Sequence, residues 1–203
     1  IRLINLAGHD AETVRIEEEI KREPAIAVNL LRIVNTAGYG ISRRVASLRQ
    51  AITLLGRRQL QRWLQLLLMA PAGSAPDASR SPLLQVAALR GRMMEMLMER
   101  TCRHDHLLAD QAFITGIMSM MPAALGLPMN EIFEQIDLEP EIQQALAAHE
   151  GILGKALALI ECFDVEAHAG CDRLLAEMPG LDRGMLNVCL VESLRWVNGS
   201  DDE

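Results

Sequence analysis

Apolar residues recur at the spacing of an α-helix along almost the whole chain, and this pattern constrains the fold more than any other feature. The period-two alternation of a β-strand is found nowhere. The apolar residues are mainly Leu, Ala, Ile and 11 Met, with only 2 Trp, 1 Tyr and 3 Phe. Since such residues favour helices over sheets, the sequence predicts an all-α core.

Helix-starting and helix-breaking residues divide this pattern into segments. Pro24 and Pro82 suit first helical positions, and Ser47 with Gln50 has the spacing of a capping box before a short helix that Gly56 can close. The expected helices cover residues 3–22, 24–35, 48–55, 57–70, 82–103, 108–121, 129–135, 140–148, 153–163, 165–177 and 182–197.

The length of 203 residues suits one domain that buries roughly 70 per cent of its unfolded surface. The segment after residue 70 is rich in Pro, Ala, Gly and Ser and is the expected hinge. We therefore predict a single multi-helix bundle over residues 1–203, with two packed lobes as an alternative: residues 1–70, a hinge at 71–81, and residues 82–203.

The cysteine pattern and the hydropathy indicate a soluble, reduced, cytoplasmic chain with no membrane partner. The 4 cysteines show no CxxC spacing, and neither a signal peptide nor an apolar run of 18 residues is visible. No phosphate-binding glycine loop or dinucleotide fingerprint occurs, so no cofactor is expected. Because no Met precedes Ile1, we expect a fragment of a longer protein.

The net charge of -7 conceals a strong asymmetry along the chain. Acidic residues are absent between Pro24 and Pro76, whereas sixteen acids and four bases follow from Glu131 onward. A basic N-terminal lobe docked on an acidic C-terminal lobe explains this pattern, and an anion-binding surface is the alternative. Nucleic acid is an unlikely partner because few aromatic residues accompany the arginines. The candidate interaction surface consists of Arg43, Arg44, Arg49, Arg57, Arg58 and Arg62.

Several segments together resemble a known family. Residues 30–40, LLRIVNTAGYG, and residues 45–56, VASLRQAITLLG, are similar to the HDOD domain, a relative of the HD and HD-GYP metal-dependent phosphohydrolases. Residues 83–97, which include Arg90 and Glu95, together with residues 112–116, 127–129 and 192–196, look like one subgroup. This subgroup is the C-terminal HDOD domain of bacterial signalling proteins with an upstream EAL domain. The resemblance implies an HD-like helical bundle, an EAL domain upstream, and a role in cyclic-di-GMP-linked signal transduction.

The same resemblance implies that the metal site is degenerate. In ligand-bearing relatives an adjacent His-Asp pair follows a Gly and two apolar residues, here Gly116, Ile117 and Met118. The two ligand positions are then Ser119, a weak neutral donor, and Met120, a thioether that hard cations ignore. We therefore expect no bound metal and no enzymatic activity.

A literal His104-Asp105 pair, flanked by His106, occurs elsewhere. It lies in a polar break between two expected helices, and neighbouring residues on a helix diverge by about 100 degrees, so the sequence predicts an exposed turn. His149 with Glu150 is interpreted in the same way, as a polar helix end.

Other notable residues have structural interpretations. We expect the methionine-rich residues 93–98 to lie in the core, and Arg90 and Glu95 to form an ion pair between helices. The acidic residues of the first helix are expected to face solvent: Glu12, Glu17, Glu18 and Glu19.

The leading hypothesis is a non-catalytic signalling module that acts by contact with the upstream EAL domain or other signalling proteins. Self-association between the basic and acidic surfaces is left open. One alternative is a nucleotide or anion receptor that uses the basic stretch from Arg43 to Arg62. Another is an unconventional metal-dependent phosphohydrolase with ligands from His104, His106 and His149.

Overall fold

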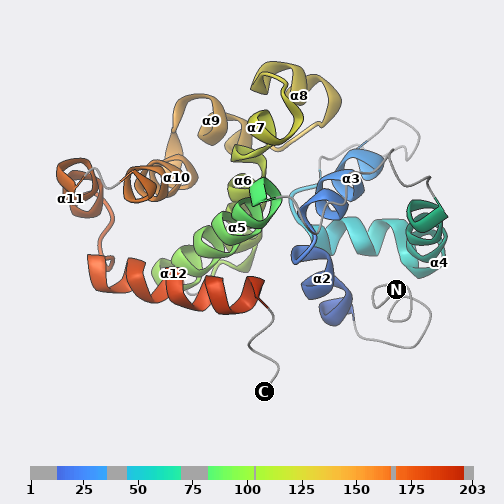
Figure 1. Cartoon of the computed structure of the whole chain (residues 1–203), viewed down its shortest axis with the longest axis horizontal. Helices are drawn as coiled ribbons and strands as arrows, with labels where there is room; N and C mark the ends of the chain where they lie inside the picture. The colour runs from blue at the N-terminus through green and yellow to red at the C-terminus, as the bar shows by residue number, and fades with distance from the viewer. Residues whose placement is uncertain (1–12, 36–44, 70–81, 103, 166–167, 199–203) are drawn as a thin grey trace.

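Every element of secondary structure in the described residues is an α-helix, which confirms the predicted all-α, HD-like bundle. The computed structural model describes residues 13–35, 45–69, 82–102, 104–165 and 168–198, with the backbone alone for residues 33, 57–58, 61–69 and 168–169. The hinge predicted at residues 71–81 lies outside these segments. The helices (Figure 1) are α2 (Thr13–Lys21), α3 (Pro24–Val34), α4 (Leu48–Met69), α5 (Pro82–Thr101), α6 (His106–Ser119), α7 (Met121–Leu125), α8 (Met129–Gln135), α9 (Pro140–Ala148), α10 (Gly151–Asp164), α11 (His168–Ala176) and α12 (Arg183–Val197).

Local signals in the sequence set many of the helix ends. Pro24, Pro82 and Pro140 are each the first residue of a helix, where the missing N–H costs no hydrogen bond. Asp105 caps α6 by accepting a hydrogen bond from the Leu108 N–H at 3.0 Å. Asp182 caps α12 in the same way.

The predicted cap and break of α4 are both present. Ser47 Oγ accepts a hydrogen bond from the Gln50 N–H at 3.1 Å, as a capping box requires. The Gln50 side chain returns to the Ala46 N–H at 3.0 Å, one residue earlier than the box predicts. Gly56 has φ 71° and ψ 155° and divides α4 into two halves, which confirms the break expected at this residue.

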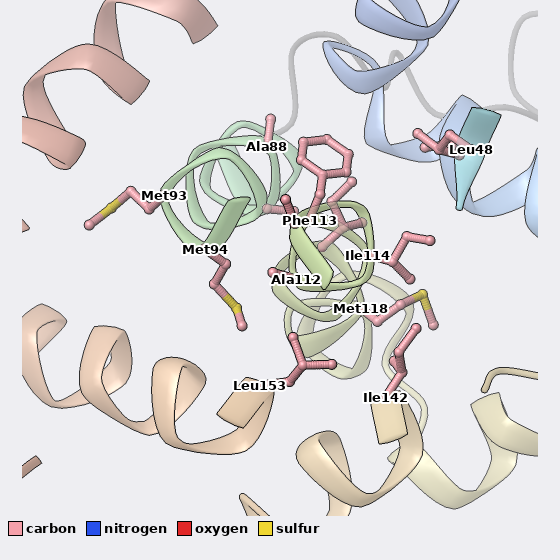
Figure 2. Close-up of a cluster of buried hydrophobic side chains, with 14 of the residues drawn as sticks. Leu48, Ala88, Met93, Met94, Ala112, Phe113, Ile114, Met118, Ile142 and Leu153 are labelled. Carbon is pink, nitrogen blue, oxygen red and sulfur yellow. The ribbon is translucent and has the colours of Figure 1, made fainter. Parts of the chain in front are cut away.

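Helices α5 and α6 form the centre of the bundle (Figure 1). Met93, Met94, Met96 and Met98 are at most 4 per cent exposed, so the methionine-rich segment belongs to the core as predicted. Figure 2 shows Ile142 of α9 and Leu153 of α10 on one side of this helix pair and Leu48 of α4 on another. The buried side chains from α2 to α12 form one continuous hydrophobic cluster.

The two central helices make their closest approach at two glycines. A Cβ atom on Gly116 would lie 2.6 Å from Gly91 Cα and 2.8 Å from the Arg90 carbonyl oxygen. A Cβ on Gly91 would lie 3.0 Å from a side-chain carbon of Ile117. Backbone therefore packs directly on backbone at this crossing, and no side chain fits between the helices.

The described residues contain one stretch, His106–Leu125, with the length and composition of a membrane-spanning helix. Half of this stretch is buried inside the protein. Its apolar character fits its packing in the core, because α6 carries a continuous run of buried residues, 112–118, and packs against α5.

We predict that Gly116→Ala lowers the free energy of unfolding by about 3 kcal/mol, because the new methyl group would meet backbone atoms that cannot move aside. Gly184→Ala on α12 is the control. Its methyl group would meet the Asp182 side chain at 3.1 Å, so we expect a change below about 1 kcal/mol. Urea denaturation followed by circular dichroism measures both, and equal stability of the two variants would contradict the backbone contact.

Candidate functional site

Ser119 and Met120, which the sequence places at the former ligand positions, lie where α6 ends. Ser119 is the last residue of α6, and Met120 caps the helix with its N–H directed at the Ile117 and Met118 carbonyl groups. Both side chains are half-buried. The helix expected to continue to residue 121 is therefore interrupted at Met120, and α7 begins at the next residue.

The hydroxyl group of Ser119 is occupied by two hydrogen bonds. Arg90 of α5 donates from Nη1 to Ser119 Oγ at 3.0 Å, and the hydroxyl donates to the Gly116 carbonyl oxygen at 2.7 Å. The close crossing of α5 and α6 at Gly116 makes this contact possible, because Arg90 and Ser119 flank that crossing. A guanidinium group thus lies beside the position expected for an imidazole ligand.

Two carboxylates of α10 surround the same guanidinium group. Arg90 Nη2 donates to Asp164 Oδ2 at 2.8 Å, and Nη1 lies 3.6 Å from Glu161 Oε1. Glu161 Oε2 is in turn 2.8 Å from His149 Nε2. The Arg90 side chain is 12 per cent exposed, whereas Glu161 and Asp164 are 39 and 42 per cent exposed. We call Arg90, Ser119, Glu161, Asp164 and His149 the Arg90 cluster.

The Arg90 cluster contains its own positive charge. A guanidinium group donates hydrogen bonds but offers no lone pair to a metal ion. It compensates the carboxylates that would otherwise attract a cation. Among the residues that the structure describes, no group of three His, Cys, Asp or Glu side chains is arranged to hold a metal ion.

The expectation that Arg90 and Glu95 form an ion pair between helices is wrong, because both residues lie on α5 and each is paired with other residues. Arg90 contacts α10, whereas Glu95 contacts Lys21 of α2. Five positions on a helix are separated by about 140 degrees, so the two side chains leave α5 on different faces.

A second group of charges lies between α2, α4, α5 and α6, and its members Glu17, Lys21 and Glu95 are at most 4 per cent exposed. Lys21 Nζ lies 2.6 Å from Glu95 Oε1 and 3.8 Å from Asp110 Oδ1. It also lies 3.1 Å from Glu17 Oε1, in an ion pair that is not oriented for a hydrogen bond. Arg49 binds Glu17 at 2.8 Å. Arg92 binds Glu95 at 2.6 Å. We call these six residues the Lys21 cluster.

Electrostatics keep Lys21 protonated. Burial alone would lower its pKa, but the carboxylates of Glu95 and Glu17 outweigh this effect and raise the pKa above its ordinary value. A protonated lysine is neither a base nor a nucleophile, so the Lys21 cluster is structural. Burial raises the pKa of Asp110, and nearby Lys21 opposes this change only in part.

The expectation that Glu17 faces solvent is wrong, because this side chain is 1 per cent exposed. Glu17 shares a helix face with the buried residues Ile16 and Ile20, and Lys21 follows it at the i,i+4 spacing. The position of Glu17 and Lys21 on this apolar face could have predicted a buried ion pair. The partner Glu95 lies 74 positions from Lys21, too distant for a single sequence to reveal.

The remaining candidate residues are not brought together by the described structure. His104, Asp105 and His106 are exposed at the start of α6, which confirms the predicted turn. His149 follows α9, has φ 55°, and contacts Glu161 of α10.

Only one member of the basic surface has a described side chain. Arg43 and Arg44 lie outside the described residues, and Arg57, Arg58 and Arg62 lie on α4 with only their backbone described. Arg49 is 52 per cent exposed and is already paired with Glu17. The docking of this basic surface on the acidic C-terminal helices therefore stays a prediction.

A pocket of about 880 Å³ opens beside Arg49, within the size range of small-molecule sites. Its wall includes Glu139 and Glu141, and Leu54 and Leu107 are large exposed apolar residues in it. The described part of the pocket is therefore mixed in charge. Its lining consists of Val45, Ala46, Arg49, Gln50, Thr53, Leu54, Leu107, Gln111, Glu139 and Glu141.

We predict that Arg90→Ala lowers the free energy of unfolding by about 2 kcal/mol, because the contacts with two carboxylates and the hydrogen bond to the half-buried Ser119 are lost. Arg90→Lys should restore only part of this loss, since an ammonium group lacks the fork that reaches both Ser119 and Asp164. Arg173→Ala is the control: its side chain is 86 per cent exposed, so we expect a change within about 0.5 kcal/mol. Equal effects of Arg90→Ala and Arg173→Ala in urea denaturation would contradict the cluster.

We predict opposite behaviour for the two carboxylates near Lys21. Glu95→Gln removes the carboxylate nearest to Lys21, which also binds Arg92, and should cost about 3 kcal/mol at pH 7. Asp110→Asn should cost less than about 1 kcal/mol, because burial already disfavours the ionised carboxyl group.

The pH dependence provides a second measurement for Asp110. Its folded-state pKa is raised, so its contribution to stability is present at low pH and is lost as the pH rises through that pKa. The stability of Asp110→Asn relative to the wild type should therefore increase from about pH 4 to about pH 7. Chemical denaturation across this range measures the difference, and a decrease would show that the contact with Lys21 dominates instead.

Comparison with known proteins agrees with the resemblance seen in the sequence. The family model of the HDOD domain matches residues 3–154. The protein YuxH of Bacillus subtilis, whose name calls it uncharacterized, is 24% identical over 200 residues, which cover 98% of this chain and 47% of YuxH. Cyclic di-GMP phosphodiesterase CdgJ of Vibrio cholerae is 30% identical over 189 residues, which cover 92% of this chain and 42% of CdgJ.

This chain therefore spans less than half the length of these two relatives. No solved structure matches it significantly. The HDOD match begins before α2 and ends in the first turn of α10, so it includes both central helices and the residues of the α5–α6 crossing. On this match, the chain belongs to the HDOD domain family.

Proposed function

We propose that this HDOD domain is a non-catalytic module that acts by protein contact in cyclic-di-GMP-linked signal transduction. The signalling context rests on the relative that is named a cyclic di-GMP phosphodiesterase and that aligns with 92% of this chain. The absence of catalysis rests on one observation: the Ser119 hydroxyl, at the expected position of a histidine ligand, is hydrogen bonded to the Arg90 guanidinium group.

The chemistry of the site supports this proposal. Hydrolysis of a phosphodiester by an HD-type site requires nitrogen and oxygen ligands that bind a cation and lower the pKa of a bound water. Ser119 and Met120 supply a hydroxyl and a thioether, and both α10 carboxylates in contact with Arg90 are already compensated by it. A second cation here would be repelled by the guanidinium group.

We further propose that catalytic activity in the full protein resides in an EAL domain outside these 203 residues. The chain covers 42% of the phosphodiesterase relative, which leaves more than half of that protein for other domains. We place the protein in the cytoplasm. None of the four cysteines forms a disulfide bond in the described structure, which supports a reducing compartment.

The alternative of an anion receptor has one supporting observation, the pocket beside Arg49. Two features favour the contact module over this alternative. Glu17 neutralises Arg49 at 2.8 Å, and Glu139 and Glu141 add negative charge to the same pocket wall. A phosphate-bearing ligand would meet repulsion from these carboxylates.

We predict that the purified 203-residue chain hydrolyses neither cyclic di-GMP nor bis(p-nitrophenyl) phosphate, with or without added Mn²⁺ or Mg²⁺. Metal analysis should show no stoichiometric transition metal. Product formation is measured by chromatography of the nucleotide. Turnover that depends on a bound metal would overturn the proposal.

Two further measurements with the same sample distinguish a role in protein contact from a role in ligand binding. Addition of the chain to the separately purified remainder of its parent protein should change the phosphodiesterase rate of that remainder. Calorimetric titration of the chain with cyclic di-GMP should give no binding heat. Micromolar binding that is abolished by Arg57→Ala or Arg58→Ala would favour the anion receptor instead.

A further inference from the structure

Helices α10 and α11 pack against each other (Figure 1), and each of them carries one cysteine. Cys162 lies in the last turns of α10, and Cys171 lies in the first turn of α11. Cys171 is 3 per cent exposed, whereas Cys162 is half-buried and more accessible. Neither residue takes part in the Arg90 cluster or the Lys21 cluster.

Gly170 makes room for this contact. A Cβ atom on Gly170 would lie 2.6 Å from Cys162 Sγ, so the sulfur occupies the space that any larger residue would fill. Gly170 directly precedes Cys171, which places the Cys162 sulfur against the backbone next to the second thiol. The Cys162 sulfur therefore lies close to the residue that carries the second thiol.

The two cysteines differ in their exposure and therefore in their chemical roles. Burial raises the pKa of Cys171, and the neighbouring Cys162 adds to this effect, so Cys171 is held as a protonated thiol. The more exposed Cys162 is the thiol that a dissolved reagent reaches first.

We propose that Cys162 and Cys171 are a redox-active pair that closes to an intramolecular disulfide by exchange with a small-molecule disulfide such as oxidised glutathione. The Cys162 thiolate attacks one sulfur of the reagent, which forms a mixed disulfide and releases one glutathione thiol. Cys171 then gives up its proton and attacks the Cys162 sulfur of the mixed disulfide, and this step releases the second glutathione thiol. Two protein thiols are oxidised, and one glutathione disulfide is reduced to two thiols.

The disulfide would connect α10 covalently to α11. Because α10 also carries Glu161 and Asp164 of the Arg90 cluster, α11 would then be tied to the helix that contacts the centre of the bundle. This inference is independent of the proposed function, since it requires neither catalysis nor a partner.

The experiment treats the full 203-residue chain with oxidised glutathione, blocks remaining thiols with an alkylating reagent, and measures intact mass and cysteine-containing peptides. We expect the loss of two hydrogen atoms and a peptide that links Cys162 to Cys171. Cys171→Ala should instead retain one stable glutathione adduct at Cys162, because the second step is removed.

A variant with Cys102→Ser and Cys189→Ala is the control, since these cysteines lie after α5 and on α12. It should form the same linked peptide at the same rate as the wild type. Circular dichroism establishes that each variant is folded before oxidation. A stable glutathione adduct at Cys162 in the wild type, with Cys171 still reduced, would overturn the proposal.

Discussion

The close approach of α5 and α6 at Gly116 is the constraint on which the rest of the structure depends. Backbone meets backbone at this crossing, with room for no Cβ atom. Arg90 therefore comes within 3.0 Å of Ser119, and the same guanidinium group reaches Asp164 of α10. A larger separation of the two helices would break the contact between Arg90 and Ser119 and weaken the contact between Arg90 and Asp164. The packing and the chemistry of this site thus have one geometric origin.

Helix α5 carries opposite charges on two of its faces, and these charges connect it to α10 and to α2. Arg90 joins it to α10, and Glu95 joins it to α2 through Lys21. Buried ion pairs contribute little net stability when compared with apolar packing, but removal of one partner is costly. Such pairs therefore specify which helices neighbour one another.

Much of the fold could be predicted from the sequence because its signals are local. Pro24, Pro140 and the break at Gly56 were visible as residue types with strong backbone preferences. The site could be predicted only in part. The position of Ser119 followed from a resemblance, but its partner Arg90 is 29 residues away, and Asp164 is 74 residues from Arg90. Contacts of this range depend on how helices cross, which one sequence does not encode in any short pattern.

The contact between Arg90 and Ser119 also limits how a metal ligand could be introduced at this place. A histidine at position 119 alone would face a fixed positive charge, and removal of Arg90 alone would leave Glu161 and Asp164 without their counter-ion. An engineered metal centre would therefore require both substitutions in the same protein.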